Sequence, residues 1–524
     1  MIDTLEVDPR APRAPLPTPP RIVGAVSGLV AGLSSVCVGI LVTALGDSAS
    51  PIDAVGSSFI DRVPRWLKNL AIDLFGTNDK TALRVGIWIV LAIAATALGA
   101  TRRRSAYVGG TIVFTMLGLA SAAERTGTNT WSYVGPVIGA VAGVAAFALL
   151  LQSGTREWFA RRRPTESAAP LGFDRRRFVG AAGAVSAVAL ASGLLGRWRQ
   201  DDRVRRIESQ RPSTLPEVDD SVNVPNTDGF HPTEPFFTPN DDFYRIDTAM
   251  SFPTVDRDSW SFTIDGLVET PLTLTYADLL ALPQVERPVT LCCVSNPVGG
   301  PFIGTAMWQG VLLADLLDRV GVLDGAEQVF STSLDGWTCG FPVEVALDGR
   351  DCMVAIGMNG EPLPLEHGFP ARLVVPGLYG YVSATKWLAR IELATWDREG
   401  YWVPLGWSRL GPVKTQSRID VPRHREKVAP GRITIAGVAW AQHTGIEKVE
   451  VRVDDGPWQR AELGNDVSDD TWRQWILEWD AAPGRHVVQV RATDKDGVTQ
   501  TEVVQDVAPD GATGWHTRTF DVTN

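Results

Sequence analysis

The chain has 524 residues and a formal net charge of −11. Its length allows three or four domains with large cores, and its acidic balance argues against a nucleic-acid-binding protein. Its five cysteines include no CxxC pair, so they do not form a disulfide scaffold or a zinc site of that kind. Cys339 and Cys352 could still pair in an exported domain.

Nearly all the long apolar segments lie before residue 200. Each of five runs is long enough to cross a bilayer, which takes about 20 residues. They span 22–45, 83–100, 107–123, 133–151 and 178–196. They are rich in Gly and Ala, which suits helix packing in lipid, and carry no charge at mid-run, so anchoring is their expected role. We expect an all-α transmembrane domain over 22–196, after a disordered cytoplasmic N-terminus at 1–21.

Basic residues set the expected orientation of these helices. Arg102–Arg104 lie between the second and third runs, and seven arginines lie between the fourth and fifth. By the positive-inside rule both loops are cytoplasmic, so everything after residue 197 lies outside the cytoplasm. Asp174–Val179, with three arginines before a small-residue apolar run, resembles a twin-arginine export signal; a plain cytoplasmic anchor is the alternative.

Two further segments flank the membrane helices. Over 52–75, apolar residues recur at helical spacing with charges between them, which predicts an amphipathic helix. This helix either lies on the outer membrane surface or forms an ordinary soluble helix in the loop. Residues 197–235 are charged and rich in proline, and we expect them to form a linker.

Residues 236–411 mix short strands with short helices, which predicts an α+β domain. Alternating patterns favour strands at 260–268 and 329–337, and a strand followed by a short helix at 272–282. The pattern at Trp308–Leu317 predicts the start of an amphipathic helix.

Residues 412–524 form the last expected domain. Alternating strands are joined by Asp-Gly and Pro-Gly turns, which is typical of an immunoglobulin-like β-sandwich. The expected strands cover 433–440, 449–454, 472–479 and 486–494.

Two segments of the α+β domain carry chemistry. Thr290–Gly300 follows an apolar approach and ends in turn residues, so it places the Cys293 thiol at a loop tip. Cys292 and Cys293 are also compatible with two small buried apolar side chains. Met358–Trp387 fixes irregular backbone around one His, one Arg and one Lys, which suits an extended, phosphate-bearing ligand.

Taken together, these segments resemble the sulfite oxidase family of molybdenum enzymes over roughly residues 235–524. The motifs are Cys293-x-x-Asn296, His367-Gly368-x-Pro370-x-Arg372, Pro376-Gly377-x-x-Gly380 and Lys386-Trp387. The resemblance implies that Cys293 is the catalytic thiolate on molybdenum, which is also bound by molybdopterin. It implies that His367, Arg372, Ser383 and Lys386 hold the pterin and its phosphate. Ser333 and the pair Tyr244 and Arg245 would complete the cradle.

The resemblance also implies the activity. It indicates a membrane-anchored oxidoreductase that transfers oxygen on a small sulfur compound and exchanges electrons with a separate cytochrome or quinone-linked carrier. It implies a homodimer through residues 412–524, with a monomeric accessory sandwich as the alternative. Sulfite oxidases have arginines where this chain has Pro297-Val298, so a sulfoxide reductase of the same family is a competing interpretation. A membrane-tethered binding module without metal is the rival from another class.

Overall fold

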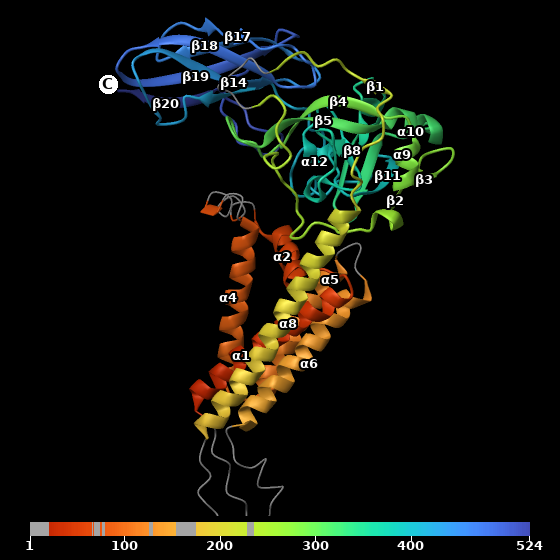
Figure 1. Cartoon of the computed structure of the whole chain (residues 1–524), viewed down its shortest axis with the longest axis vertical. Helices are drawn as coiled ribbons and strands as arrows, with labels where there is room; N and C mark the ends of the chain where they lie inside the picture. The colour runs from red at the N-terminus through yellow and green to blue at the C-terminus, as the bar shows by residue number, and fades with distance from the viewer. Residues whose placement is uncertain are drawn as a thin grey trace, which may run out of the picture. The chain divides into compact units, whose positions relative to one another are not determined.

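The computed structural model describes residues 20–64, 67, 74–75, 79–124, 129–153, 174–227 and 235–523. The chain divides into two compact units, shown in Figure 1. One comprises Met1–Val204 with Ala249–Ser251, and the other Arg205–Thr248 with Phe252–Asn524. Except for its last two residues, the expected disordered N-terminus lies outside the described residues.

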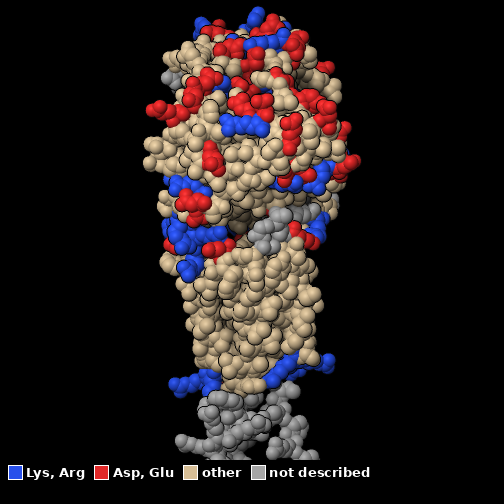
Figure 2. Space-filling model, turned by 90° about the vertical axis from the view of Figure 1, so that its right-hand side faces the viewer, with Lys and Arg blue, Asp and Glu red and all other residues tan. Residues whose placement is uncertain are grey.

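The first unit is helical. Its main helices are α1 (Arg21–Leu45), α2 (Pro51–Arg62), α4 (Asp79–Ala100), α5 (Arg104–Ala123), α6 (Thr130–Ser153) and α8 (Arg175–Gln210), of which residues from Arg205 on belong to the second unit. Among the described residues, five helices are long and apolar enough to cross a membrane by length and composition. These are the helices predicted from the five apolar runs. On the face in Figure 2, the middle of this unit shows no coloured charge, and Lys or Arg side chains gather at its end.

Small residues let these helices pack closely. A Cβ atom on Gly28 of α1 would lie 2.2 Å from the Ala95 carbonyl oxygen of α4. A Cβ atom on Gly139 of α6 would lie 2.3 Å from the Ser35 carbonyl oxygen of α1. Backbone therefore approaches backbone at both contacts, as small residues permit between closely packed helices.

Two helix ends differ from the prediction. Helix α8 continues to Gln210, well into the expected linker, because its charged residues favour helix and the next proline is Pro212. Helix α2 ends at Arg62, before Pro64, although the pattern predicted a helix to residue 75. Most of the remaining predicted segment lies outside the described residues.

The second unit begins with two mixed sheets, which confirms the predicted α+β character. One sheet has the order β1-β4-β5-β8-β10, with β9 on β8: Asp220–Ser221, Val285–Cys292, Ile303–Leu312, Met353–Met358, Arg372–Val374 and Glu361–Pro362. The other has the order β3-β2-β11-β6-β7: Leu272–Thr275, Ser261–Gly266, Leu388–Ala394, Gln328–Ser333 and Thr338–Pro342. The helices between them are α9 (Tyr276–Ala281), α10 (Leu313–Val320), α11 (Val343–Leu347) and α12 (Gly380–Ser383).

The expected helix start at Trp308 is wrong. Residues 308–312 belong to strand β5, which pairs with β4 on one side and β8 on the other, and the helix begins only at Leu313. Trp308 is fully buried in this central strand. A short apolar run is compatible with both a buried strand and a buried helix, so periodicity alone cannot distinguish the two.

Gly310 marks how tightly β5 is packed. A Cβ atom at this position would lie 2.2 Å from the Val354 carbonyl oxygen of β8. We expect Gly310→Ala to destabilise the protein by about 1–3 kcal/mol, as overpacked cores do, and to lower its thermal unfolding midpoint. Gly183→Ala in α8, where the added Cβ meets open space, is the matched control. An unchanged midpoint for Gly310→Ala would contradict this packing.

The C-terminal region is a sandwich of two sheets. One contains β12 (Gln416–Val421), β14 (Gly431–Trp440), β18 (Arg473–Ala481) and β17 (Glu462–Leu463). The other contains β13 (Lys427–Val428), β20 (His516–Val522), β19 (Gly484–Asp494), β15 (Ile446–Val453) and β16 (Gln459–Arg460). Inward side chains such as Trp475, Val488 and Phe520 form one shared core. The four predicted strands are thus confirmed.

Candidate cofactor site

The Cys293 loop starts directly at the end of strand β4. Cys292 is the last strand residue and is 2% exposed, whereas Cys293 is half-buried. The Cys293 N–H donates to the Phe302 carbonyl at 3.0 Å, and Asn296 Oδ1 accepts the Phe302 N–H at 2.9 Å. Asn296 therefore braces the loop that presents Cys293.

The two thiols have different surroundings. Cys293 Sγ lies 3.0 Å from Ser295 Oγ. Burial raises the Cys293 pKa, and the Ser295 hydrogen bonds and the Lys386 charge oppose that rise. Burial and the neighbouring Cys293 raise the Cys292 pKa well above its ordinary value. All five cysteines are free, so Cys339 and Cys352 do not pair.

Arg372 begins strand β10 and is 4% exposed. Its guanidinium donates to the carbonyls of His367 at 3.2 Å and Leu373 at 3.3 Å, and lies 4.9 Å from the Trp308 ring centroid. Among the described residues, no Asp or Glu forms an ion pair with it. Burial lowers the Arg372 pKa to about 10. A buried cation without an acidic partner is costly unless a ligand supplies the negative charge.

His367 lies next to this guanidinium. Its Nε2 atom is 2.9 Å from the Asn240 carbonyl oxygen, so Nε2 carries the proton that is donated. Burial, together with the charges of Lys386 and Arg372, lowers the His367 pKa to about 4. The imidazole is therefore neutral at pH 7 and acts as a fixed polar group.

Lys386 and Arg245 meet at one carboxylate, that of Asp247. Lys386 Nζ donates to Asp247 Oδ2 at 3.0 Å and to the Glu366 carbonyl at 3.2 Å. Arg245 Nε donates to the same Asp247 oxygen at 3.0 Å. Burial lowers the Lys386 pKa to about 8 against the opposing effect of Asp247. Sequence reasoning missed Asp247, because it stands outside the motifs that carried the resemblance.

The remaining predicted site residues fall into two groups. Burial raises the pKa of half-buried Tyr244 well above its ordinary value, the charges of Cys293 and Cys292 raise it further, and Arg372 opposes them. Tyr244 thus shares the surroundings of the thiols and of Arg372. The buried hydroxyls of Ser333 and Ser383 bond within their own turns, to the Asp335 N–H at 3.4 Å and the Tyr379 carbonyl at 3.1 Å. The structure joins neither serine to the Lys386 and Arg372 contacts.

The C-terminal sandwich reaches the same loop. A Cβ atom on Gly299, whose φ is +72°, would lie 2.2 Å from the His516 ring. Arg418 donates to the Gly300 carbonyl at 3.2 Å and pairs with Asp420 at 2.6 Å. Sequence reasoning missed these residues because they come from strands far along the chain.

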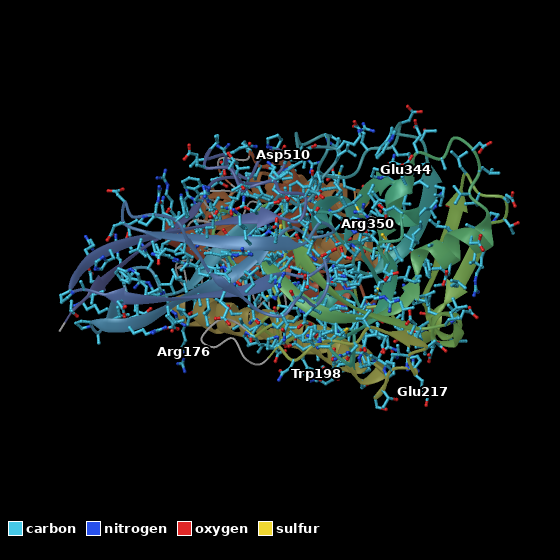
Figure 3. All side chains as sticks on the ribbon, turned by 90° about the horizontal axis from the view of Figure 1, so that it is seen from above. Arg176, Trp198, Glu217, Glu344, Arg350 and Asp510 are labelled. Atoms are coloured by element: carbon cyan, nitrogen blue, oxygen red, sulfur yellow. The ribbon has the colours of Figure 1, made fainter. Side chains whose placement is uncertain are left out.

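Tyr379 is linked to the thiols by electrostatics and to a second ion pair by a hydrogen bond. Burial, followed by the charge of Cys292, raises its pKa. Its hydroxyl accepts the Lys414 N–H at 3.4 Å, and Lys414 Nζ pairs at 2.9 Å with Asp510, which is labelled in Figure 3. Sequence reasoning did not assign Tyr379 either.

The buried imidazoles predict how stability depends on pH. The pKa of His367 is lowered to about 4 and that of His516 to about 3, below the ordinary value of 6.5. Between these values and 6.5 the unfolded chain binds more protons, so stability rises with pH and is lost on acidification. We expect the unfolding midpoint to fall from pH 6.5 to pH 4, and His516→Gln to flatten that fall. An equal pH slope in the variant would contradict the assignment.

The described residues fit an anionic ligand such as a pterin phosphate. Three cations, Arg245, Arg372 and Lys386, are accompanied by one paired carboxylate, that of Asp247. In the described parts of the chain, no group of three His, Cys, Asp or Glu side chains could hold a metal. A metal held by one protein thiolate and otherwise by its own organic ligand fits such a donor set.

Comparisons with known proteins agree with this geometry. Residues 249–402 match the model of the oxidoreductase molybdopterin binding domain. The chain is 29% identical to human mitochondrial sulfite oxidase over 357 residues, which are 58% of this chain and 63% of that protein. It therefore spans less than two thirds of the human enzyme.

Two further similarities complete the comparison. The sulfane dehydrogenase SoxCD of Paracoccus pantotrophus is 26% identical with a TM-score of 0.48, covering 56% of this chain and 85% of that one. The sulfite oxidase of Arabidopsis thaliana is 30% identical over 336 residues, which are 52% of this chain and 84% of that protein. On the identity and coverage of the Arabidopsis enzyme, the chain belongs to the sulfite oxidase family of molybdenum- and molybdopterin-dependent oxidoreductases.

Proposed function

We propose that this protein is a membrane-anchored oxidoreductase that transfers an oxygen atom on a small sulfur compound of the sulfite type. Arg372 carries this proposal. It is a buried guanidinium with no acidic partner in the described residues, and its charge and that of Cys293 both affect the pKa of Tyr244. A site for an anion beside an accessible thiol is what a molybdopterin enzyme of this family needs.

The residues divide the work of binding between them. In this proposal Cys293 is the thiolate ligand of molybdenum and the catalytic residue, since it is the accessible member of the cysteine pair. Arg372, Lys386 and Arg245 neutralise the phosphate and the ring oxygens, with neutral His367 and Tyr244 as polar contacts. Ser333 and Ser383 shape the turns around the cradle. The bound cofactor supplies two-electron redox chemistry, and the protein supplies orientation and charge.

The helical unit serves as a multi-pass anchor in this proposal. Five helices of suitable length and composition support it, and under the positive-inside rule the arginines favour a catalytic unit outside the cytoplasm. Asp174 Oδ1 caps α8 by accepting the Arg176 N–H at 3.1 Å and the Arg177 N–H at 3.2 Å. These arginines form the twin-arginine-like segment that we propose for export. We further propose that electrons pass to a separate cytochrome or quinone-linked carrier.

The C-terminal sandwich also has a proposed role. Two sheets over one core support an immunoglobulin-like fold, and we propose that the domain forms a homodimer. Contacts of the same domain with the Cys293 loop, through His516 and Arg418, support a second task in shaping the substrate entrance.

The substrate class is tested by two assays on the same preparation. We expect sulfite to drive reduction of ferricyanide, because the human and Arabidopsis relatives are sulfite oxidases. The competing outcome is sulfoxide-dependent oxidation of a reduced viologen dye without sulfite turnover. That result would overturn the sulfite assignment. It would indicate that Pro297-Val298, which replaces the arginines of sulfite oxidases, suits a neutral substrate. If metal-loaded protein shows neither of these two activities, that absence would contradict oxygen transfer on sulfite or on a sulfoxide.

A further inference from the structure

We propose that Asp247 is a positioning residue of the cofactor cradle, whose carboxylate holds Arg245 and Lys386 in place for an anionic ligand. The inference rests on the proposed function and extends it to a carboxylate that the motifs do not assign. A negative charge at an anion site is unexpected, because it repels the ligand. Its presence therefore indicates another purpose. Asp247 serves that purpose by organising cations.

The geometry shows a shared anchor. Arg245 Nε and Lys386 Nζ both donate to Asp247 Oδ2, each at 3.0 Å. The Asp247 side chain is 6% exposed and that of Lys386 is 11% exposed, so little water screens the pair. Charge-assisted hydrogen bonds of this kind are about twice as strong as neutral ones.

Lys386 is also fixed from two other sides. Its ammonium group donates to the Glu366 carbonyl at 3.2 Å and lies 5.1 Å from the Trp387 ring centroid. An ammonium group has three donors, so the bonds to Asp247 and Glu366 leave one for a ligand. These contacts therefore orient the third N–H donor of Lys386 and leave it available to a ligand.

Asp247 also offsets repulsion among the cations. Burial disfavours the charged form of Lys386 and so lowers its pKa, Asp247 opposes this, and Arg372 and Arg245 lower the pKa further. The other titratable groups that sense Lys386 are His367, which is neutral, and the Cys293 thiol. Without the carboxylate, buried Arg372, nearly buried Lys386 and the Arg245 side chain, which is 35% exposed, would be left to repel one another. Removal of the carboxylate would lower the pKa of Lys386 further and reduce the charged share of Lys386 that attracts an anion.

The opposite role is that of a placeholder. In that case the Asp247 carboxylate would occupy the cations only until the ligand displaces it, and removing its charge would strengthen ligand binding. A positioning residue predicts the reverse, because its loss disorders and discharges Lys386. The two roles therefore differ in the sign of the effect.

The experiment compares Asp247→Asn with Asp242→Asn in the full-length protein. Asp242 is an exposed residue of the same segment, so its variant removes an equal charge and leaves the Asp247 bonds to Arg245 and Lys386 in place. Molybdenum and pterin per chain are measured after expression in a cofactor-producing host. We expect Asp247→Asn to lose about tenfold or more in loading, the range typical of groups that orient metal-site ligands. Asp242→Asn should match the wild type, and Asp247→Glu, which restores the charge, should recover part of the loading.

A second readout separates positioning from simple loss of structure. Cofactor-free protein is treated with an amine-acylating reagent at pH 7, and modification of Lys386 is followed by mass spectrometry. We expect Lys386 to react several-fold faster in Asp247→Asn, because only the neutral amine is nucleophilic. Asp242→Asn should react at the wild-type rate.

The outcomes divide cleanly. Wild-type loading with unchanged Lys386 reactivity in Asp247→Asn would overturn the positioning role while leaving the proposed function intact. Higher loading in that variant would overturn it in favour of the placeholder. A wild-type chain that folds but binds neither molybdenum nor pterin would defeat the proposed function itself, and this inference with it.

Discussion

We expect the replacement of Cys293 with serine to lower turnover of the proposed sulfur substrate by more than about 100-fold. Changes to groups that merely orient a metal ligand lower metal affinity or activity about 10–100-fold, and loss of the thiolate itself lowers activity at least as much. The loop should survive the change, because Asn296 and the Phe302 backbone bonds brace it and Ser295 can bond to a hydroxyl. The measurement is steady-state turnover per folded chain, with circular dichroism as a check of folding.

Cys292→Ala is the matched control for that variant. Cys292 points into the core at 2% exposure and bonds only weakly, at 3.6 Å to the Cys293 carbonyl and 3.9 Å to Asn296 Nδ2. We therefore expect it to retain turnover within a few-fold. Full activity in Cys293→Ser together with loss in Cys292→Ala would reverse the assignment of the thiolate.

Replacing Arg372 with methionine separates cofactor binding from folding. Two charge-assisted hydrogen bonds from a guanidinium fork contribute about 3–6 kcal/mol, so we expect cofactor affinity to fall roughly 100-fold or more. The unfolding midpoint of the cofactor-free variant should be unchanged or higher. Burial of the cation costs free energy, which offsets the lost bonds to the His367 and Leu373 carbonyls.

Arg390→Met supplies the comparison. Arg390 pairs with Asp265 and Glu392 at 2.9 Å each and is 39% exposed, so its loss should leave cofactor content unchanged. Retention of molybdenum and pterin by Arg372→Met, with a large fall in its unfolding midpoint, would show that Arg372 is structural. The proposed function would then lose its main support.

The sequence was most informative where local chemistry decides structure. The apolar approach to Cys293 predicted a thiol at a loop tip, and strand β4 does end one residue before it. Alternation with Asp-Gly turns predicted the sandwich strands, because each strand there has one face in the core. His367, Arg372 and Lys386 followed from a dense motif that folds into one region.

Sequence was least informative where long-range packing decides. Strand β5 is buried between two neighbours, so Trp308–Leu312 lacks the alternation that marks a half-exposed strand. Asp247 matters only because folding brings Lys386 to it, from far along the chain. His516 similarly reaches Gly299 only through the sandwich. The local sequence around Asp247 or His516 does not predict either of these long-range contacts.

The buried polar groups explain why these distant contacts are specific. Trp472 of the sandwich donates its indole N–H to the Phe236 carbonyl at 3.0 Å and its backbone N–H to Thr290 Oγ1 at 2.7 Å. Thr290 lies on β4, three residues before Cys293. A buried donor or acceptor without a partner costs more free energy than its hydrogen bond contributes when formed. These bonds therefore fix the position of the sandwich against the loop.

The most direct test of the central claim is X-ray absorption at the molybdenum edge, on full-length protein purified from a cofactor-producing host. The account predicts close to one molybdenum and one pterin per chain, and one fewer sulfur ligand in Cys293→Ser than in the wild type. Folded wild-type protein without molybdenum and pterin would contradict it. So would an identical sulfur shell in the two proteins, since Cys293 would then not bind the metal.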